Sequence, residues 1–300
     1  MTGRIALIGF GEAGSAFAGG WLDGPLAGTD APPAAYDIKT DDPATAPGKR
    51  RDYEVAGIRG SVSAAEALDG AVLVFSLVTA DASLAVAEDA ATKLAPGALY
   101  FDCNSVAPST KRKAAEAIDA VDARYVDTAV MAPVHPKRHK TPILLSGDHA
   151  EAGAEALRAL DMDVGIVRGP VGAASSIKMV RSIMIKGLEA LTAECLLAGR
   201  KAGVEEAVLD TLEKSFPDFG WRSRVGYNLE RMLTHGGRRA AEMEEVAKTV
   251  ADLGLEPRMS GATVGWQRQL GALGLAAADS YSETADRILE AFDKQPETSR

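Results

Sequence analysis

The chain has 300 residues, of which 46% are hydrophobic and 25% charged, as is usual for a globular protein. Its net charge of −9 argues against nucleic acid as a main partner, because nucleic-acid-binding proteins carry basic surfaces. The two cysteines, Cys103 and Cys195, have no metal-ligand spacing and fit a reduced, cytoplasmic compartment. We expect no bound metal, no signal peptide before the first strand and no membrane span.

The first motif lies at the start of the chain. An apolar run at residues 4–8 predicts a buried strand, and the sequence Gly9-Phe10-Gly11-Glu12-Ala13-Gly14 follows it directly, before a helical pattern. In a G-x-G-x-x-G turn the first glycine permits the tight turn, the second lets phosphates approach the backbone, and the third lets helix and strand pack closely. These six residues therefore predict a pyrophosphate-binding loop.

A second strand, predicted at residues 33–37, ends in an acidic residue at the distance that this motif requires. Asp37 can accept hydrogen bonds from the adenosine ribose and would repel a 2′-phosphate, so it predicts NAD as the cofactor. NADP stays possible, because Lys39, Arg50 and Arg51 follow and could hold a 2′-phosphate if their loop folds back.

The rest of the first half alternates strand and helix patterns, which predicts an α/β Rossmann-like domain with a doubly wound, mainly parallel sheet. We expect strands at 71–78, 98–102, 141–147 and 164–167, with a further one starting at 124, and helices at 82–94, 109–118 and 150–160.

After this region only helical patterns appear. A helix over 172–202 is long enough to connect two bodies, and helices are expected at 205–216, 223–234, 238–253, 260–275 and 282–292. We therefore predict a dinucleotide-binding domain over residues 1–168 and an all-α substrate and dimerisation domain over residues 169–300.

The junction between these domains carries a specific resemblance. The sequence Gly169-Pro170-Val171-Gly172-Ala173-Ala174-Ser175-Ser176-Ile177-Lys178 resembles the β-hydroxyacid dehydrogenase family, which includes 6-phosphogluconate and 3-hydroxyisobutyrate dehydrogenases. The resemblance covers nearly the whole chain and implies that Lys178 is the catalytic residue on a long interdomain helix. Residues 235–245 resemble a less characterised branch of the family.

The chemistry of a lysine fits this role. Oxidation of an alcohol requires the hydroxyl proton to leave, and a neutral amine within hydrogen-bond reach can accept it. Lys178 could also be a solvated lysine on a helix surface. Arg181 and Ser182 stand where the family usually has asparagine; Arg181 could bind a substrate carboxylate with two hydrogen bonds, or form a structural ion pair.

Residues at the ends of two strands resemble family positions that contact the ligands. Asn104 and Ser105 correspond to positions near nicotinamide and substrate, and Val78 and Thr79 to the loop that flanks the adenine and its ribose. Ordinary turn chemistry is the alternative explanation, since asparagine and serine favour turns.

The expected substrate loop departs from the family. Met131, Ala132 and Pro133 replace the usual Ser-Gly-Gly, and proline has no N–H to offer a carboxylate. A larger or more apolar small-molecule substrate is therefore expected. The roles of His135, in the basic stretch 135–140, and of Arg238 and Arg239 are left open: a substrate gate or a solvated loop for the first, a replacement for the family's cofactor-proximal lysine for the others.

The sequence thus predicts an NAD(P)-dependent oxidoreductase that transfers a hydride between nicotinamide and a hydroxy acid or related alcohol. An imine reductase, a redox-neutral C–C lyase that retains its nucleotide, and a nucleotide sensor without turnover are the alternatives. The helical domain of this architecture implies a homodimer.

Overall fold

The structure is a computed structural model that describes residues 4–294. Its described residues fall into two compact units, residues 4–179 and residues 180–294. The predicted domain boundary at 168/169 stays a prediction.

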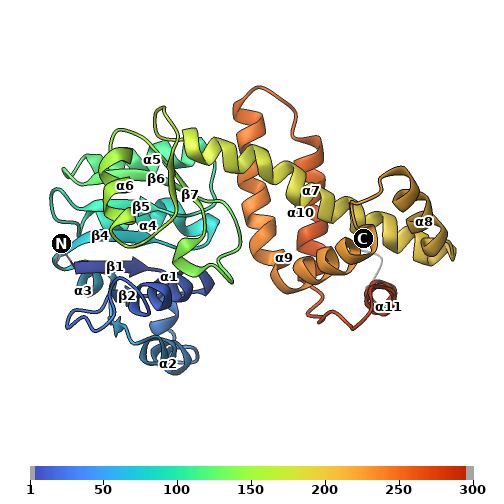
Figure 1. Ribbon diagram of the computed structural model, residues 1–300, viewed down its shortest axis with the longest axis horizontal. Coiled ribbons are helices and arrows are strands. Elements are labelled where there is room, and N and C mark those ends of the chain that lie inside the picture. The colour runs from blue at the N-terminus through green and yellow to red at the C-terminus, as the bar shows by residue number, and fades with distance from the viewer. Residues whose placement is uncertain (1–3, 295–300) are drawn as a thin grey trace. The chain divides into compact units, whose positions relative to one another are not determined.

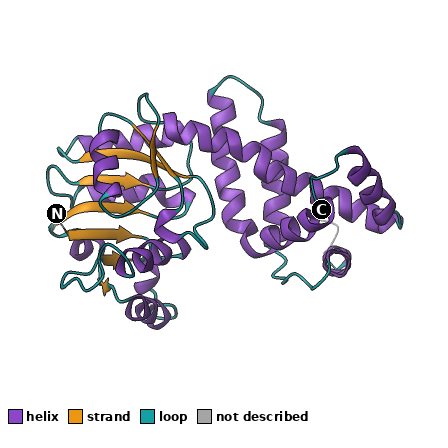
Figure 2. Ribbon diagram, viewed as in Figure 1, coloured by secondary structure: helices purple, strands orange, loops and turns teal. Residues whose placement is uncertain are grey.

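An eight-stranded sheet forms the centre of the first unit, with the order β3-β2-β1-β4-β5-β6-β7-β8 (Figure 2). Neighbouring strands are parallel except β6 and β7, which pair antiparallel. The predicted doubly wound, mainly parallel sheet is confirmed. The strands are β1 (Arg4–Ile8), β2 (Ala34–Tyr36), β3 (Arg59–Gly60), β4 (Ala71–Ser76), β5 (Leu99–Asp102), β6 (Arg124–Val130), β7 (Ile143–Ser146) and β8 (Val164–Ile166).

Helices cover both faces of this sheet (Figure 1). They are α1 (Glu12–Leu22), α2 (Ala46–Ala56), α3 (Ala64–Leu68), α4 (Ser83–Ala91), α5 (Pro108–Asp119) and α6 (Ala150–Arg158), with single 3₁₀ turns η1 (Ile38–Thr40), η2 (Ala80–Ala82) and η3 (Arg138–Lys140). The sequence patterns did not predict α2, β3 or α3: α2 is mostly polar, and β3 and α3 have only two and five residues.

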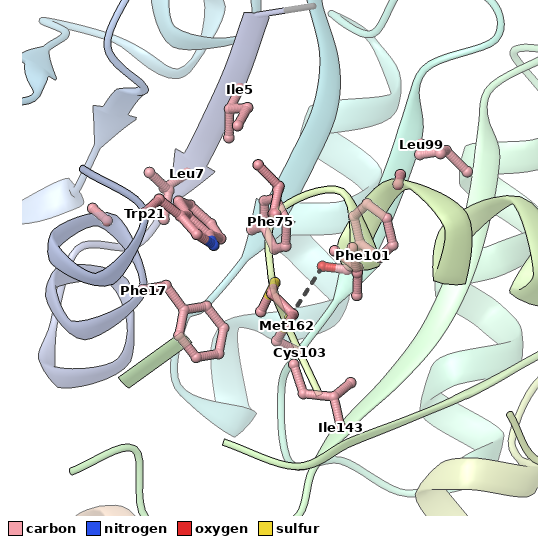
Figure 3. Close-up of a cluster of buried hydrophobic side chains, with 14 of the residues drawn as sticks. Ile5, Leu7, Phe17, Trp21, Phe75, Leu99, Phe101, Cys103, Ile143 and Met162 are labelled. Carbon is pink, nitrogen blue, oxygen red and sulfur yellow. Dashed lines mark hydrogen bonds between the residues drawn. The ribbon is translucent and has the colours of Figure 1, made fainter. Parts of the chain in front are cut away.

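Alternate strand residues point to two separate cores. On one face a chain of aromatic rings joins α1 to the sheet, with Trp21 4.9 Å from Phe75 and Phe75 4.9 Å from Phe101 between ring centroids (Figure 3). On the other face Tyr100 and Tyr125 are fully buried among residues of α3, α4 and α5. A sheet that is buried on both faces explains why its central strands read as nearly continuous apolar runs.

The second unit is helical. Helix α7 (Ala173–Ala202) starts in the first unit and continues into the second, followed by α8 (Glu205–Ser215), α9 (Trp221–Asp252), α10 (Arg258–Gly271) and α11 (Tyr281–Asp293). The two helices predicted at 223–234 and 238–253 are wrong as separate elements, since α9 runs unbroken through Gly236 and Gly237. Close packing explains the first of these glycines: a Cβ on Gly236 would lie 2.3 Å from the carbonyl oxygen of Gln267 in α10.

None of the helices between residues 4 and 294 combines the length and apolar character that crossing a bilayer would require.

Candidate active site

The glycine turn after β1 has the geometry that a dinucleotide requires. Gly9 has a φ of +88°, and a Cβ there would lie 2.5 Å from the carbonyl oxygen of Leu77, so no larger residue fits. A Cβ on Gly14 would lie 2.9 Å from the carbonyl oxygen of Gly9, which confines helix α1 to glycine at this point. Around Gly11, by contrast, a Cβ would meet no atom within 4 Å. The loop is therefore tight where it packs and open at the position where phosphates approach.

Asp37 lies directly beside this loop. Its Oδ2 accepts the backbone N–H of Phe10 at 2.8 Å, and its Oδ1 accepts that of Lys39 at 3.0 Å. The carboxylate is thus fixed at the end of β2 and keeps lone pairs for a ribose hydroxyl. Within the loop Glu12 is exposed and Ala13 half-buried.

The basic residues near Asp37 have separate positions. Lys39 lies in η1, and Arg50 and Arg51 lie on α2; all three are exposed. Lys49, which the sequence reading did not single out, is buried instead: its Nζ donates to the carbonyl oxygen of Phe10 at 2.8 Å and pairs with Asp52 at 2.8 Å. This bond ties the glycine loop to helix α2.

Asn104 joins the ends of β4 and β5. Its Oδ1 accepts the N–H of Val78 at 2.8 Å, and its Nδ2 donates to Ser76 Oγ at 2.9 Å and Asp102 Oδ1 at 2.7 Å. Because the side-chain amide is buried and bonded within the protein, Asn104 holds the two strand ends together. Ser105 is half-buried and Thr79 is exposed at the same edge of the sheet.

Lys178 lies in the second turn of α7 and is half-buried. Burial raises the pKa of the Cys103 thiol to about 12, and the positive charges of Lys111 and Lys178 act against this rise. Three residues before Lys178, the Ser175 N–H donates to Asp127 Oδ2 of β6 at 3.1 Å, so this part of α7 lies against the sheet.

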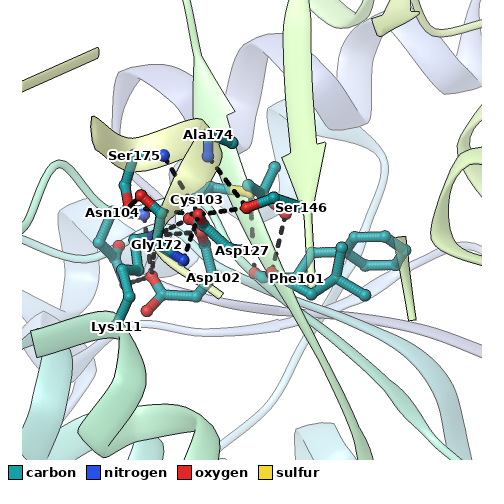
Figure 4. A network of polar contacts seen from close by, with 12 residues as sticks. Phe101, Asp102, Cys103, Asn104, Lys111, Asp127, Ser146, Gly172, Ala174 and Ser175 are labelled. Carbon is teal, nitrogen blue, oxygen red and sulfur yellow. Dashed lines mark hydrogen bonds and ion pairs between the residues drawn. The ribbon is translucent and has the colours of Figure 1, made fainter. Parts of the chain in front are cut away.

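A buried polar network lies beneath the start of α7 (Figure 4). Asp102, Lys111 and Asp127 are fully buried, with Lys111 Nζ 3.1 Å from Asp102 Oδ1 and 3.7 Å from Asp127 Oδ1. Neither Asp102 nor Asp127 has a role in the sequence-based prediction. For Asp102 the available signal was an acidic residue at the end of an apolar run; Asp127 lies within the strand that starts at residue 124 and has no such signal.

The expected substrate loop follows β6. Met131 is half-buried and its N–H donates to the carbonyl oxygen of Pro142 at 2.9 Å, whereas Ala132 and Pro133 are exposed. His135 is exposed as well. On α7, in the second unit, Arg181 is exposed and Ser182 buried.

Arg238 and Arg239 of α9 have structural partners in the second unit. Arg239 is buried and forms a two-pronged ion pair with Glu189 of α7, whose Oε2 also accepts from Gln267 Nε2 at 2.7 Å. Arg238 lies 3.9 Å from Glu242, which pairs with Lys186 at 2.7 Å. In residues 4–294 no three His, Cys, Asp or Glu side chains gather as a metal site would require.

Comparison with known proteins agrees with this geometry. Residues 4–162 match the family model described as the NAD binding domain of 6-phosphogluconate dehydrogenase, and residues 200–270 match a domain of unknown function, DUF1932. The chain belongs to the β-hydroxyacid dehydrogenase family. It is a member of an uncharacterised branch, it carries an NAD(P)-binding domain, and it is dehydrogenase-like.

Individual relatives support the assignment. The chain is 33% identical to a 3-hydroxyisobutyrate dehydrogenase of Pseudomonas aeruginosa over 171 residues, which are 55% of this chain and 57% of that enzyme. It is 39% identical to a solved conserved hypothetical protein of Sinorhizobium meliloti, with a TM-score of 0.72 over 97% of both chains. A reductive aminase of Aspergillus terreus solved with NADPH, 17% identical, has a TM-score of 0.55 over 96% of this chain and 99% of that one, and shares the fold.

Proposed function

We propose that this protein is an NAD(P)-dependent dehydrogenase that oxidises the CH–OH group of a hydroxy acid or related alcohol, with Lys178 as general acid and base. The observation that carries the proposal is the position of Lys178: it follows Ser175 by three residues on α7, and the Ser175 N–H is bonded to Asp127 in the sheet that also carries the glycine loop. Because β1, β4 and β5 are parallel, their carboxyl ends share one edge of the sheet.

The residues of that edge fit an NAD(P) molecule. The loop of residues 9–14 would hold the pyrophosphate through the N–H groups of residues 11–14, because those of Gly9 and Phe10 are bonded to Tyr36 and Asp37. Asp37 would hold the adenosine ribose, and Val78, Thr79 and Ser105 would border the rest, with Asn104 fixing the loops between them. The bound cofactor supplies the hydride acceptor. In the oxidation direction the neutral Lys178 amine accepts the hydroxyl proton, and in the reverse direction its ammonium donates a proton to the carbonyl oxygen.

We propose NAD as the preferred cofactor. The Asp37 carboxylate is held at the end of β2 by two backbone N–H groups, so it cannot turn away from a 2′-phosphate without losing both bonds. NADP requires compensation from Lys39, Arg50 or Arg51, which are exposed.

The substrate is proposed to be larger or more apolar than is usual for the family. Met131, Ala132 and Pro133 replace a loop of small polar residues, and the Met131 N–H is already bonded to Pro142. Arg181, three residues after Lys178 on α7, is proposed to bind a substrate carboxylate, and Ser182 to lie beside it.

The test is an absorbance assay of purified protein with NAD or NADP and a panel of hydroxy acids, including apolar and aromatic ones. Lys178→Ala is expected to lower kcat by about 10² to 10⁴-fold, as loss of a general base does. Lys201→Ala is the matched control, because Lys201 lies on the same helix and is 68% exposed. Full turnover by Lys178→Ala would exclude this role for the lysine.

The same assay separates the alternatives. An imine reductase would consume reduced cofactor with cyclic imines and act on no alcohol, and the absence of a polar substrate loop is the feature that favours it. A redox-neutral lyase would form product without net NADH, a possibility raised by the same altered loop, and a sensor would bind nucleotide without turnover. One NADH per product formed would exclude the last three.

We also propose that residues 1–168 bind the dinucleotide, and that residues 169–300 contribute to the substrate site and form a homodimer. Support for the dimer comes from α7, which exposes Val180, Met184 and Leu191. Apolar side chains spaced four and seven residues apart lie on one side of a helix and favour a second helical surface as cover.

A further inference from the structure

The start of α7 has a partner for each of its first N–H groups. The Ala173 N–H donates to Pro170 at 3.1 Å, and the Ser176 N–H donates to Gly172 at 2.8 Å. The two N–H groups between them bond to side chains from the sheet: Ala174 donates to Ser146 Oγ at 2.9 Å and Ser175 to Asp127 Oδ2 at 3.1 Å. The first turn of a helix leaves such donors without intrahelical partners, so these bonds fix its position.

Asp127 is the centre of this arrangement. It lies in the middle of β6 opposite Ser146 of β7, and it is fully buried. Its Oδ2 also accepts from Ser146 Oγ at 2.8 Å, from Gly172 N at 3.0 Å and from Ser175 Oγ at 3.2 Å. A single carboxylate oxygen thus accepts hydrogen bonds from β7, from the junction turn and from the start of α7, as Figure 4 shows.

The charge of Asp127 suits that place. The N–H groups at a helix start carry partial positive charge, and a carboxylate is favourable beside them. The other oxygen, Oδ1, lies 3.7 Å from Lys111 Nζ without a hydrogen bond. Lys111 pairs more closely with Asp102, at 3.1 Å, so Lys111 keeps a partner whatever stands at position 127.

The junction glycine shows how closely the helix start is seated. Gly172 has a φ of +105°, and a Cβ on it would lie 3.0 Å from Pro108 Cβ at the start of α5. The glycine-rich junction therefore serves packing, and the protein's own carboxylate, not a phosphate group, lies at the N-terminus of α7.

Lys178 follows Ser175 by three residues, which places it about one turn farther along the same face, about 4.5 Å along the axis. We propose that Asp127 is the positioning residue for Lys178: by holding the first turn of α7 it sets the place of the amine at the edge of the sheet. The inference rests on the proposed function of Lys178 as general acid and base.

The first experiment compares Asp127→Asn with Ser280→Ala. The Asp127→Asn change keeps the size of the side chain and removes its negative charge. The new amide NH2 group would face either the N–H groups at the start of α7 or the ammonium of Lys111, and all of these are donors. We expect kcat to fall about 10²-fold with KM for NAD nearly unchanged, because misplacing a catalytic group by about 1 Å costs that much. Ser280→Ala removes a helix cap in the other unit, where Ser280 Oγ accepts the Glu283 N–H at 3.1 Å, and should lower stability without changing kcat.

The second measurement needs no substrate. Hydrogen exchange followed by mass spectrometry should show faster exchange in Asp127→Asn for the peptide that contains residues 172–176, with peptides of α1 unchanged. If Asp127→Asn does not fold, Ser146→Ala serves instead, since it removes only the partner of the Ala174 N–H and should give a smaller change in the same direction.

The outcomes distinguish the two proposals. Full turnover in Lys178→Ala overturns the role of the lysine, and with it the reason to position it. Loss of turnover in Lys178→Ala, together with wild-type kcat and wild-type exchange in both Asp127→Asn and Ser146→Ala, overturns only the positioning role. Equal losses of kcat in Asp127→Asn and Ser280→Ala would also overturn it, because they would reflect stability alone.

Discussion

At the level of single residues, Gly9 and Gly11 differ in why a glycine is needed: Gly9 for folding and Gly11, we propose, for binding. Both belong to the loop after β1, but an added Cβ meets the backbone at Gly9 and open space at Gly11. Gly9 is required by the protein itself, whereas the folded chain gives no steric reason for glycine at position 11. A ligand that approaches the backbone at Gly11 is the reason that we propose.

Alanine substitutions test this distinction. Gly11→Ala should change the free energy of unfolding by less than about 0.5 kcal/mol, as for an exposed site, and weaken NADH binding by about tenfold or more. Gly9→Ala should cost about 1–3 kcal/mol or more, because alanine is strained at a positive φ. Thermal unfolding without ligand and fluorescence titration with NADH measure the two quantities. Unchanged NADH affinity in Gly11→Ala would argue against a pyrophosphate at this loop.

The sequence contained part of the proposed site. The glycine spacing, Asp37 and Lys178 could be proposed from it because each belongs to a short local pattern. The internal bonds of Asn104 and the helix contacts of Asp127 could not, since Asn104 bonds to a residue 28 positions away and Asp127 to one 48 positions away. Such pairings follow from strand order, which spacing along the chain does not contain.

At the level of elements, the packing of α9 against α10 overrides a local signal. Two successive glycines indicate a break, and each costs a helix interior about 1 kcal/mol relative to alanine. Here Gly236 and Gly271 let the two helices approach closely, with the Cβ position of Gly236 only 2.7 Å from Gly271 Cα. The close packing of the two backbones compensates for the weak helix propensity of the glycines.

The neighbouring glycines provide a matched pair for this point. Gly236→Ala should destabilise the protein by about 1–3 kcal/mol, because the new methyl group overlaps the backbone of α10. Gly237→Ala meets no atom within 4 Å and should stabilise it by up to about 1 kcal/mol. Urea unfolding gives both values. Equal changes in the free energy of unfolding for the two variants would mean that helix propensity, and not the close packing of α9 against α10, determines the effect.

A buried histidine links η3 to α1. His139 is 5% exposed and packs on Gly20, and neither ring nitrogen has a hydrogen-bond partner among residues 4–294. Burial, together with the positive charges of Lys140 and Arg138, lowers the pKa of His139 despite the nearby Asp161 carboxylate. The neutral imidazole is therefore the form that this contact accommodates.

This contact predicts a pH dependence of stability. In the unfolded chain the histidine has a pKa of about 6.5, above that in the folded protein, so the unfolded state binds the proton more tightly. The stability contribution should be complete above about pH 6.5 and decrease as the pH falls from there toward the lowered folded pKa. Urea unfolding between pH 8 and pH 5 should show this loss in wild type and in His135→Gln, and a reduced slope in His139→Leu. An unchanged slope in His139→Leu would assign the effect to other groups.

At the level of the whole molecule, the fold class was predictable because it depends on repeated signals. Apolar strand runs alternate with helical patterns through the first half, and helical patterns fill the second. The segment between residues 37 and 71 was not predictable in this way, since α2 begins at Ala46 without a side-chain cap bond and β3 has only two residues. The position of β3 is instead fixed by its parallel pairing with β2.

The proposed dimer is testable at this scale. Val180, Met184 and Leu191 are 50%, 63% and 56% exposed on α7, and their contact with a second copy would remove them from water. Light scattering at micromolar concentration should give the mass of a dimer for the wild type. Met184→Glu with Leu191→Glu should shift the mass toward a monomer, because charges at the centre of an apolar interface are costly. A wild-type monomer under these conditions would contradict the proposal.

The contrasting surroundings of the two cysteines give the chain a built-in chemical reporter. Cys195 is exposed on α7, whereas Cys103 is 6% exposed and burial raises its pKa to about 12. Cys195 lies four residues after Leu191, on the same side of α7 as the proposed dimer surface. Since the thiolate is the reactive form, a maleimide dye at neutral pH should attach to Cys195 alone in the folded variant Met184→Glu with Leu191→Glu, and reach Cys103 only when the sheet opens. In the wild type, slower labelling of Cys195 would therefore report the dimer, and labelling of Cys103 would report unfolding of the nucleotide domain.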